Sequence, residues 1–194
     1  MKKLMIMCLF LTFGVTESKA GLLLEPYVGY HLGSRDGKAK EKATGIEAAI
    51  AETDYSGAGF GARVGFQTFG LMLGGVYETI PSITSESGGT ETEGGSSAKL
   101  GVFVGYDFPL FVRVWGTYFL DVTMEDEDGN EVSDLYDSGV GAGVGLTFLP
   151  LVSLNVEYRM YTFSDDWKSG GSSYDLSGQN HSEIFLSVSL PLNL

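Results

Sequence analysis

The sequence predicts an all-β fold, an eight-stranded antiparallel up-and-down transmembrane β-barrel, and three observations lead to it. Residues 99–122 hold two segments of two-residue alternation, KLGVFVGYD and VRVWGTYFLD, joined by a short turn, and such alternation marks β-strands. One side of each segment is almost purely aliphatic or aromatic, while the other mixes glycine, charge and large rings. Each segment is about 10 residues long, the length that crosses a bilayer at a tilt.

Glycines on the mixed face favour a closed barrel over a soluble sandwich. In a strand that faces water, glycine costs backbone entropy and gains nothing, because no other group has to approach it closely. All the glycines of the expected strands except Gly75 and Gly116 fall on the inner face. A narrow, polar interior explains this distribution.

The chain of 194 residues fits a single domain and shows no linker between two. Residues 1–20 have the pattern of a secretory signal peptide, with a charged start, an apolar middle and a small-residue cleavage site that ends at Ala20. The apolar middle is much shorter than the roughly 20 residues of a spanning helix. Residues 21–194 are then the barrel domain. The single cysteine, Cys8, lies in the leader, so we expect no disulfide in the mature chain.

The charge balance excludes some partners. The formal net charge is −13, and removal of the leader makes it more negative. Such an acidic chain is not expected to bind nucleic acid or anionic lipid directly. No apolar run after the leader is long enough for a spanning helix, as expected of a barrel in which alternate residues face a polar lumen.

Eight strands follow from the alternation, and long polar loops alternate with short turns between them. The expected strands are Leu22–Leu32, Gly57–Gln67, Leu71–Thr79, Lys99–Asp107, Val112–Asp121, Asp137–Phe148, Val152–Phe163 and His181–Leu194. The even number puts both ends of the barrel on the side of the short turns, and closure leaves no exposed sheet edge.

The long loops are expected at residues 33–56, 80–97, 123–136 and 164–180. In the first loop, residues 46–52 could form a helical turn. In the third loop, Asp128-Gly129 is a hairpin signal, so the flanking strands are expected to continue above the membrane as a protruding hairpin.

Outward aromatic residues are expected to form two belts. Tyr30, Tyr77, Tyr118 and Tyr158 fall toward the long loops, whereas Phe66, Tyr106 and Phe148 fall toward the short turns. Rings are favoured at both membrane interfaces. The alternative, a soluble ligand-binding barrel, gives no reason for this sorting and would be recognised by its solubility in buffer without detergent.

One family combines the features described so far: a leader, eight alternating strands, short turns, long polar loops and a last strand that ends here at Leu194. The sequence is similar to the small eight-stranded outer-membrane barrels of Gram-negative bacteria, which include the OmpA transmembrane domain and OmpX. The resemblance covers nearly all of the mature chain. It implies an integral outer-membrane protein that contacts outer-membrane lipid and lipopolysaccharide and is inserted by the barrel-assembly machinery. The family's roles range from membrane integrity to adhesion and host interaction, so the resemblance selects no single function.

Nine charged residues are expected to face the lumen. An eight-stranded barrel is just wide enough inside to be filled by side chains, and an unpaired charge there is costly. We therefore predict a structural polar network that closes the lumen. The alternative is a small pore for ions or small solutes, in which the inward glycines leave room for water. The nine residues are Glu25, Arg63, Glu78, Lys99, Arg113, Asp121, Glu157, Arg159 and Glu183.

Signals for catalysis are weak. His31 lies close to Ser34 and Asp36, and His181 opens a strand that would neighbour the first one. Some outer-membrane lipid-modifying enzymes use a histidine with a serine or an acid near the outer rim, so a rim-located enzyme of this kind is a further alternative. Because no serine or acid has the spacing of a known motif, we predict no enzyme, no catalytic residue and no cofactor.

The acidic third loop, residues 123–136, raises the question of a metal. Asp126, Asp128 and Asn130 have the spacing of a calcium loop, but Glu131 stands where the pattern requires glycine. A solvated acidic hairpin is therefore preferred to weak divalent-ion binding that would bridge to lipopolysaccharide phosphates. The sequence as a whole favours a non-enzymatic membrane protein that supports envelope integrity or binds a surface ligand through its outer loops.

Overall fold

A computed structural model of the chain describes residues 20–109, 111–125, 135–149, 151–169 and 172–194. The expected signal peptide, apart from Ala20, and most of the acidic third loop lie outside these residues. Regular structure in the described part consists of β-strands. They are β1 (Gly21–Glu41), β2 (Glu47–Thr68), β3 (Leu71–Ile80), β4 (Thr84–Ser87), β5 (Thr90–Glu93), β6 (Ser96–Phe108), β7 (Val112–Glu125), β8 (Tyr136–Leu149), β9 (Val152–Phe163), β10 (Trp167–Ser169), β11 (Ser172–Asp175), β12 (Gln179–Ser189) and β13 (Leu192–Asn193).

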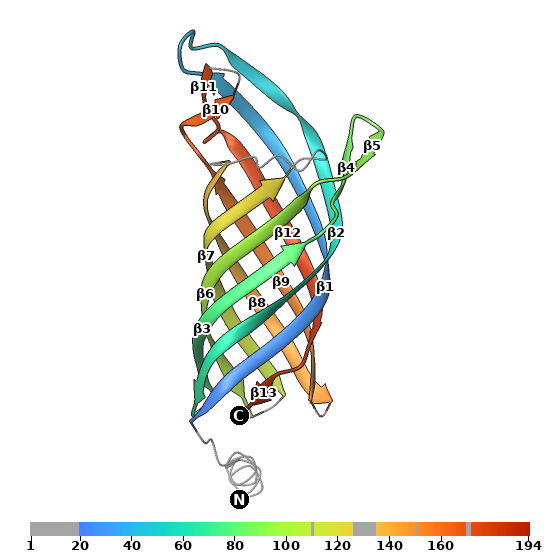
Figure 1. The fold of residues 1–194 in the computed structure, drawn as a ribbon, viewed down its shortest axis with the longest axis vertical. Coiled ribbons are helices and arrows are strands. Elements are labelled where there is room, and N and C mark those ends of the chain that lie inside the picture. Colours follow the sequence, from blue (N-terminus) through green and yellow to red (C-terminus); the bar gives the residue numbers. More distant parts are fainter. Residues whose placement is uncertain (1–19, 110, 126–134, 150, 170–171) are drawn as a thin grey trace, which may run out of the picture.

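Eight of the strands close into an antiparallel ring. Their order is β1-β2-β3-β6-β7-β8-β9-β12, and β12 pairs back onto β1. Figure 1 shows the ring as a tall barrel with strongly tilted strands. The start of β1 and the C-terminus lie at the same end, where Leu194 accepts a hydrogen bond of 3.0 Å from the amide of Leu22. The predicted fold class is confirmed.

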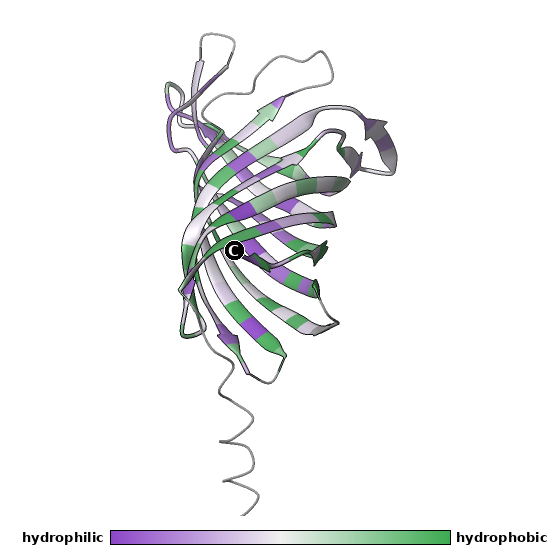
Figure 2. Ribbon diagram, turned by 60° about the horizontal axis from the view of Figure 1, so that its bottom comes forward, coloured by the Kyte–Doolittle hydropathy of each residue, from purple (hydrophilic) through white to green (hydrophobic). Residues whose placement is uncertain are grey.

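The apolar face of the sheet points outward. Val102, Val114, Val144 and Val156 are each between 39% and 47% exposed, although they are aliphatic. The residues between them along each strand face inward, and Figure 2 shows the resulting alternation of hydrophobic and hydrophilic bands along the strands. A closed barrel with an apolar outer wall and a polar interior is the architecture of an integral outer-membrane protein. Among the described residues, no helix is long and apolar enough to cross a membrane.

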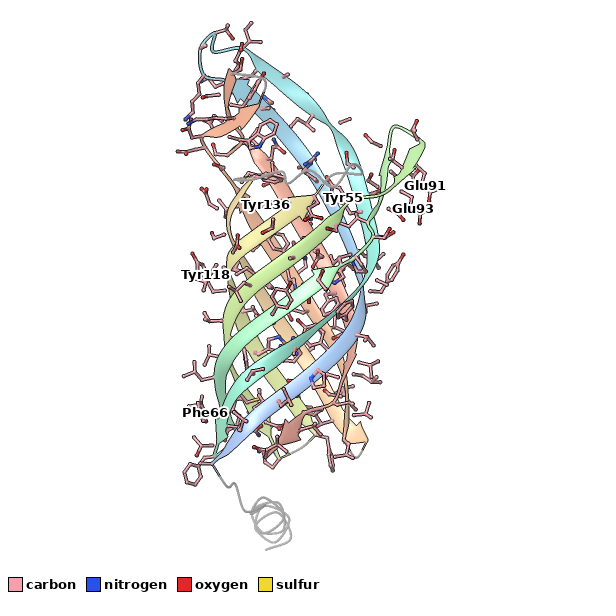
Figure 3. All side chains as sticks on the ribbon, in the orientation of Figure 1. Tyr55, Phe66, Glu91, Glu93, Tyr118 and Tyr136 are labelled. Carbon is pink, nitrogen blue, oxygen red and sulfur yellow. The ribbon has the colours of Figure 1, made fainter. Side chains whose placement is uncertain are left out.

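The outward aromatic residues lie at two heights. Figure 3 places Phe66 near the end that carries the termini and Tyr118 well above it. The rings of Tyr30, Tyr77 and Tyr158 are about half exposed, as is that of Tyr118. The side chain of Phe148 lies outside the described part of the chain. Aromatic belts at these heights mark the two membrane interfaces.

Above the upper belt, the long loops contain more strand than the sequence predicts. β1 and β2 continue as a paired hairpin through most of residues 33–56, so the helical turn expected at residues 46–52 is wrong. The second loop carries the β4–β5 hairpin and the fourth the β10–β11 hairpin. In Figure 1, β4 and β5 lean away from the barrel, while β10 and β11 lie at its mouth. The expectation failed because these segments have water on both faces and therefore lack an apolar alternation.

A bulge in β7 corrects the expectation for Asp121. Leu100 pairs with Asp121, but the next residue, Gly101, pairs with Phe119, so Leu120 is an extra residue in β7. The extra residue shifts the alternation by one position. As a result Asp121 is exposed on the outer side, whereas Val122 is buried.

The outward orientation of the apolar face predicts where a charge destabilises the barrel. Val144→Arg, midway along β8, is expected to lower the free energy of unfolding by about 2–4 kcal/mol, the cost of a cation on the lipid face at the midplane. Ile46→Arg is the control, since Ile46 is 65% exposed just before β2, above the membrane. Unfolding in urea from lipid vesicles measures both. Equal losses in the two variants would contradict the assignment of the outer wall to lipid.

Candidate functional site

The lower half of the lumen is held by two arginines and two glutamates. Arg113 Nη1 donates to Glu25 Oε1 at 2.9 Å, and Arg63 Nη1 lies 3.4 Å from the same oxygen. Arg63 Nη2 donates to Glu157 Oε2 at 2.9 Å, and the indole of Trp115 donates to that oxygen as well, also at 2.9 Å. The pairs of Arg113 (β7) with Glu25 (β1) and of Arg63 (β2) with Glu157 (β9) cross the lumen, whereas Arg63 and Glu25 are neighbours on adjacent strands.

The upper half repeats this arrangement around Arg159. Its Nη1 and Nη2 donate to the two oxygens of Glu78 at 2.7 and 3.0 Å, and Nη1 also donates to Glu183 Oε1 at 3.0 Å. Lys99 Nζ donates to the other oxygen of Glu183 at 2.7 Å. Arg159 Nε donates to Glu157 Oε1 at 3.1 Å, which joins the upper half to the lower one. The result is one continuous network of ion pairs.

The network is balanced in charge. Eight of the nine residues expected in the lumen are buried, and each of the eight forms an ion pair. Four of them are cationic and four are carboxylates. Asp121, the ninth, is the residue that the β7 bulge turns outward. Because a buried charge without a partner costs several kcal/mol, the bulge leaves the lumen without an excess anion.

Aromatic rings and glycines complete the filling. The guanidinium of Arg63 lies 4.4 Å from the ring of Trp115, and that of Arg159 lies 4.4 Å from the ring of Phe185. A Cβ atom on Gly143 would clash with the indole of Trp115, and one on Gly29 would clash with Phe185. The space beside these two inward glycines is therefore occupied by rings from neighbouring strands.

The lumen is closed above and below the network. Leu23 and Met72 are fully buried near the lower end. At the upper end Tyr136, Tyr161 and His181 form a ring layer, in which the Tyr136 hydroxyl lies 2.8 Å from His181 Nδ1. A cavity of about 30 Å³ remains between this ring layer and the network, room for roughly one water molecule.

The histidines do not assemble a catalytic site with the residues first considered. His31 is buried and faces inward, whereas Ser34 and Asp36 fall on the opposite, outward parity of β1. His31 stacks on Phe185 with ring centroids 4.2 Å apart. His181 belongs to the ring layer, so each histidine packs against aromatic rings.

One group of residues could geometrically hold a metal ion. Ligand atoms of His31, Glu78 and Glu183 all lie within 4.8 Å of one another. The two carboxylates, however, already bind Arg159 and Lys99. The guanidinium of Arg159 and the ammonium of Lys99 therefore already neutralise the carboxylates that would bind a metal ion. The calcium pattern of residues 126–131 lies outside the described residues and stays a prediction.

A second cavity, which the sequence did not predict, opens above the ring layer. We call it the outer cavity; it encloses about 440 Å³. It is lined chiefly by Arg35, Tyr55, Trp167, Tyr174, Leu176 and Gln179. These residues come from β1, β2, β10, β11, β12 and the segment between β11 and β12, and Met124, Glu125 and Leu135 beside the third loop also line the cavity. Alternation along single strands could not reveal the cavity, because three separate connections converge to form it.

No protein-family model and no curated protein matches the chain. Among solved structures, Ail, the attachment invasion locus protein of Yersinia pestis, in complex with the heparin analogue sucrose octasulfate, aligns at 11% identity and a TM-score of 0.47, covering 89% of this chain and 99% of that one. The outer membrane protein OprG from Pseudomonas aeruginosa aligns at 9% identity and a TM-score of 0.46, and the alignment covers 91% of this chain and 98% of OprG. The outer membrane protease OmpT from Escherichia coli aligns at 10% identity and a TM-score of 0.44, covering 89% of this chain and 97% of OmpT. The likeness is one of fold; at such identities neither a ligand nor an activity extends to this chain.

The network predicts that two carboxylates contribute very differently to the free energy of unfolding. Glu157→Gln keeps the shape of the side chain but removes the charge that faces Arg63 and Arg159. We expect it to lower the free energy of unfolding by about 3 kcal/mol or more. Asp121→Asn, the exposed counterpart, is expected to change it by less than about 0.5 kcal/mol. Urea unfolding in vesicles compares the two, and a larger effect at Asp121 would refute the balanced network.

Proposed function

We propose that the chain is a non-enzymatic outer-membrane barrel, exported with removal of residues 1–20, that supports the envelope and interacts at the cell surface through its outer strands. The observation that carries the proposal is the filled lumen. A continuous ion-pair network, closed at both ends by apolar or aromatic side chains, leaves the barrel wall and the outer extensions as the parts able to act.

The outer extensions support the surface role. β1 and β2 run on as a hairpin far above the upper belt, and the β10–β11 hairpin stands against β1 through the pairing of β11 with that strand. Lys42 Nζ lies 3.1 Å from Asp166 and links the hairpin end to the chain before β10. Such paired strands present a defined surface, on which binding residues are commonly placed.

Contact with lipid and lipopolysaccharide and insertion by the barrel-assembly machinery are part of this proposal. The apolar wall between the two aromatic belts would contact acyl chains. Acidic side chains such as Asp54, Glu86 and Glu91 line a groove of about 510 Å³ above that wall. In Figure 3, Glu91 and Glu93 lie on the β5 hairpin, beside the barrel.

The alternatives have less support. A small pore needs a continuous water path, yet rings stand beside the inward glycines and ion pairs cross the lumen. A lipid-modifying enzyme at the rim needs a histidine that faces a nucleophile, and His31 and Ser34 point to opposite sides of the sheet.

Reconstitution in planar bilayers tests the closed lumen. We expect no steady single-channel steps from the wild-type protein, because the network blocks the passage of hydrated ions. A general porin in the same bilayer provides the positive control. Reproducible steps from the folded wild-type barrel would overturn the proposal in favour of the pore.

A further inference from the structure

The outer cavity has polar groups that no other described residue satisfies. Gln179 is 6% exposed, and its Oε1 accepts no hydrogen bond from any residue that the structure describes. The Nε of Arg35 is buried and donates none to these residues. Within the described part of the chain, Arg35 forms no ion pair, and its guanidinium lies 5.7 Å from the ring of Tyr55. A buried polar group without a partner is costly, so an unpaired donor and an unpaired acceptor in one cavity indicate a ligand.

Irregular pairing of β1 builds this part of the cavity. The register between β1 and β2 shifts between Arg35 and Gly37, so that Gly37 pairs with Ile50. Gly37 has a φ of 127°, which favours glycine. The shift brings Ile50 into the lining. Bulges that re-aim side chains are frequent beside functional sites.

The rest of the lining is mainly apolar and aromatic. Trp167 and Tyr174 have ring centroids 5.8 Å apart, and both pack against the buried apolar cluster. Leu135 and Leu176 are 8% and 3% exposed and belong to that cluster. A volume of about 440 Å³ lies within the range of small-molecule sites, which combine an apolar lining with a few placed polar groups.

We propose that the outer cavity binds a small amphipathic carboxylate that carries an N–H or O–H donor next to the carboxylate, of the type of an N-acylated apolar amino acid. The carboxylate meets Arg35, the adjacent donor meets Gln179 Oε1, and the apolar body lies against Trp167 and Tyr174. The inference deepens the surface role proposed above and rests on it.

The strand register supports this pattern of groups. Arg35 pairs with His181 and Gly37 with Gln179, so Arg35 and Gln179 are diagonal neighbours on one face of the β1–β12 pair. Diagonal neighbours have Cβ atoms about 7–8 Å apart or somewhat less. A ligand whose carboxylate and donor nitrogen are joined through a single carbon can therefore meet both side chains at once.

Glu125 is the acidic residue of the lining, and its exposure to solvent weakens its repulsion of an anion inside the cavity. Its side chain is exposed, and Oε2 accepts a hydrogen bond of 2.9 Å from Ser96 Oγ. It therefore lies at the solvent-facing rim, while Arg35 Nε is buried. The acidic net charge of the chain opposes the approach of anions, so binding is expected to tighten as salt is added at low ionic strength.

Binding to the wild-type barrel in lipid vesicles tests the ligand chemistry. Titrations use N-acetylphenylalanine, its amide-capped analogue without the carboxylate, and 3-phenylpropanoate, which lacks the N–H. Calorimetry and tryptophan fluorescence report binding, because Trp167 lines the cavity and the other tryptophan, Trp115, is buried in the lumen. We expect N-acetylphenylalanine to bind at least about tenfold more tightly than the capped amide, the loss typical of one hydrogen bond to a charged group. We expect it to bind at least about fivefold more tightly than 3-phenylpropanoate, which leaves the buried Gln179 Oε1 without a donor.

Two variants assign that preference to the residues. Arg35→Met is expected to remove the preference for the acid over the capped amide, and Gln179→Leu the preference for the N–H donor. Lys38→Met is the matched control, because Lys38 lies on the same strand with a side chain that is 67% exposed. Circular dichroism and heat-modified gel mobility establish that each variant forms the barrel.

Equal affinity for acid and amide in the wild type, or no binding at 10 mM N-acetylphenylalanine, would overturn the inference without any variant. Retention of the preference in Arg35→Met would overturn it as well. These failures differ from failure of the proposed function. If no ligand binds and the bilayer recording shows no conductance, only the ligand inference fails. Steady conductance would instead contradict the closed lumen on which the proposed function rests.

Discussion

The structure depends on one constraint: every charge that the barrel encloses has to find a partner within the lumen. In a bilayer the backbone polar groups must be satisfied internally, which forces the sheet to close. Closure at eight strands leaves an interior that side chains fill. Arg63, Arg113, Arg159 and Lys99 therefore have to face carboxylates, and they do so in ion pairs that cross the ring from strand to strand. These pairs tie opposite walls of the barrel to each other.

The aromatic and glycine content of the inner face follows from the same constraint. Guanidinium groups that are shielded from water gain from ring faces, and here Arg63 lies near Trp115 while Arg159 lies near Phe185. Rings of that size fit in a narrow lumen only where the neighbouring strand has no side chain. Gly143 and Gly29 are the positions that provide this space. The inward glycines are thus a consequence of tight filling, and they do not indicate an open path.

Lipid explains how far the sequence could predict the fold. Between the aromatic belts one face must be apolar, so alternation revealed all eight spanning strands and eight of the nine lumen charges. Above the belts water contacts both faces, which removes the pattern, so the extensions of β1 and β2 carry no strand signal in the sequence. The bulge escaped prediction because simple alternation from Tyr118 already places Leu120 on the outer face. Nothing in the sequence signals that the next residue, Asp121, also faces outward. The outer cavity depends on contacts between connections far apart in sequence, which no periodicity records.

Depth in the membrane also decides what a cation can do in this protein. Arg63 and Arg113 are enclosed at the level of the apolar wall, so each is committed to a carboxylate and has a structural role. Arg35 lies on β1 beyond Tyr30, where the barrel has emerged from the lipid and the mouth admits water. There Arg35 has no carboxylate partner among the described residues although its Nε is buried, so its guanidinium is available to an anion that enters from the mouth. The ring layer of Tyr136, Tyr161 and His181 separates the two situations, so a ligand bound above it would leave the network below unchanged.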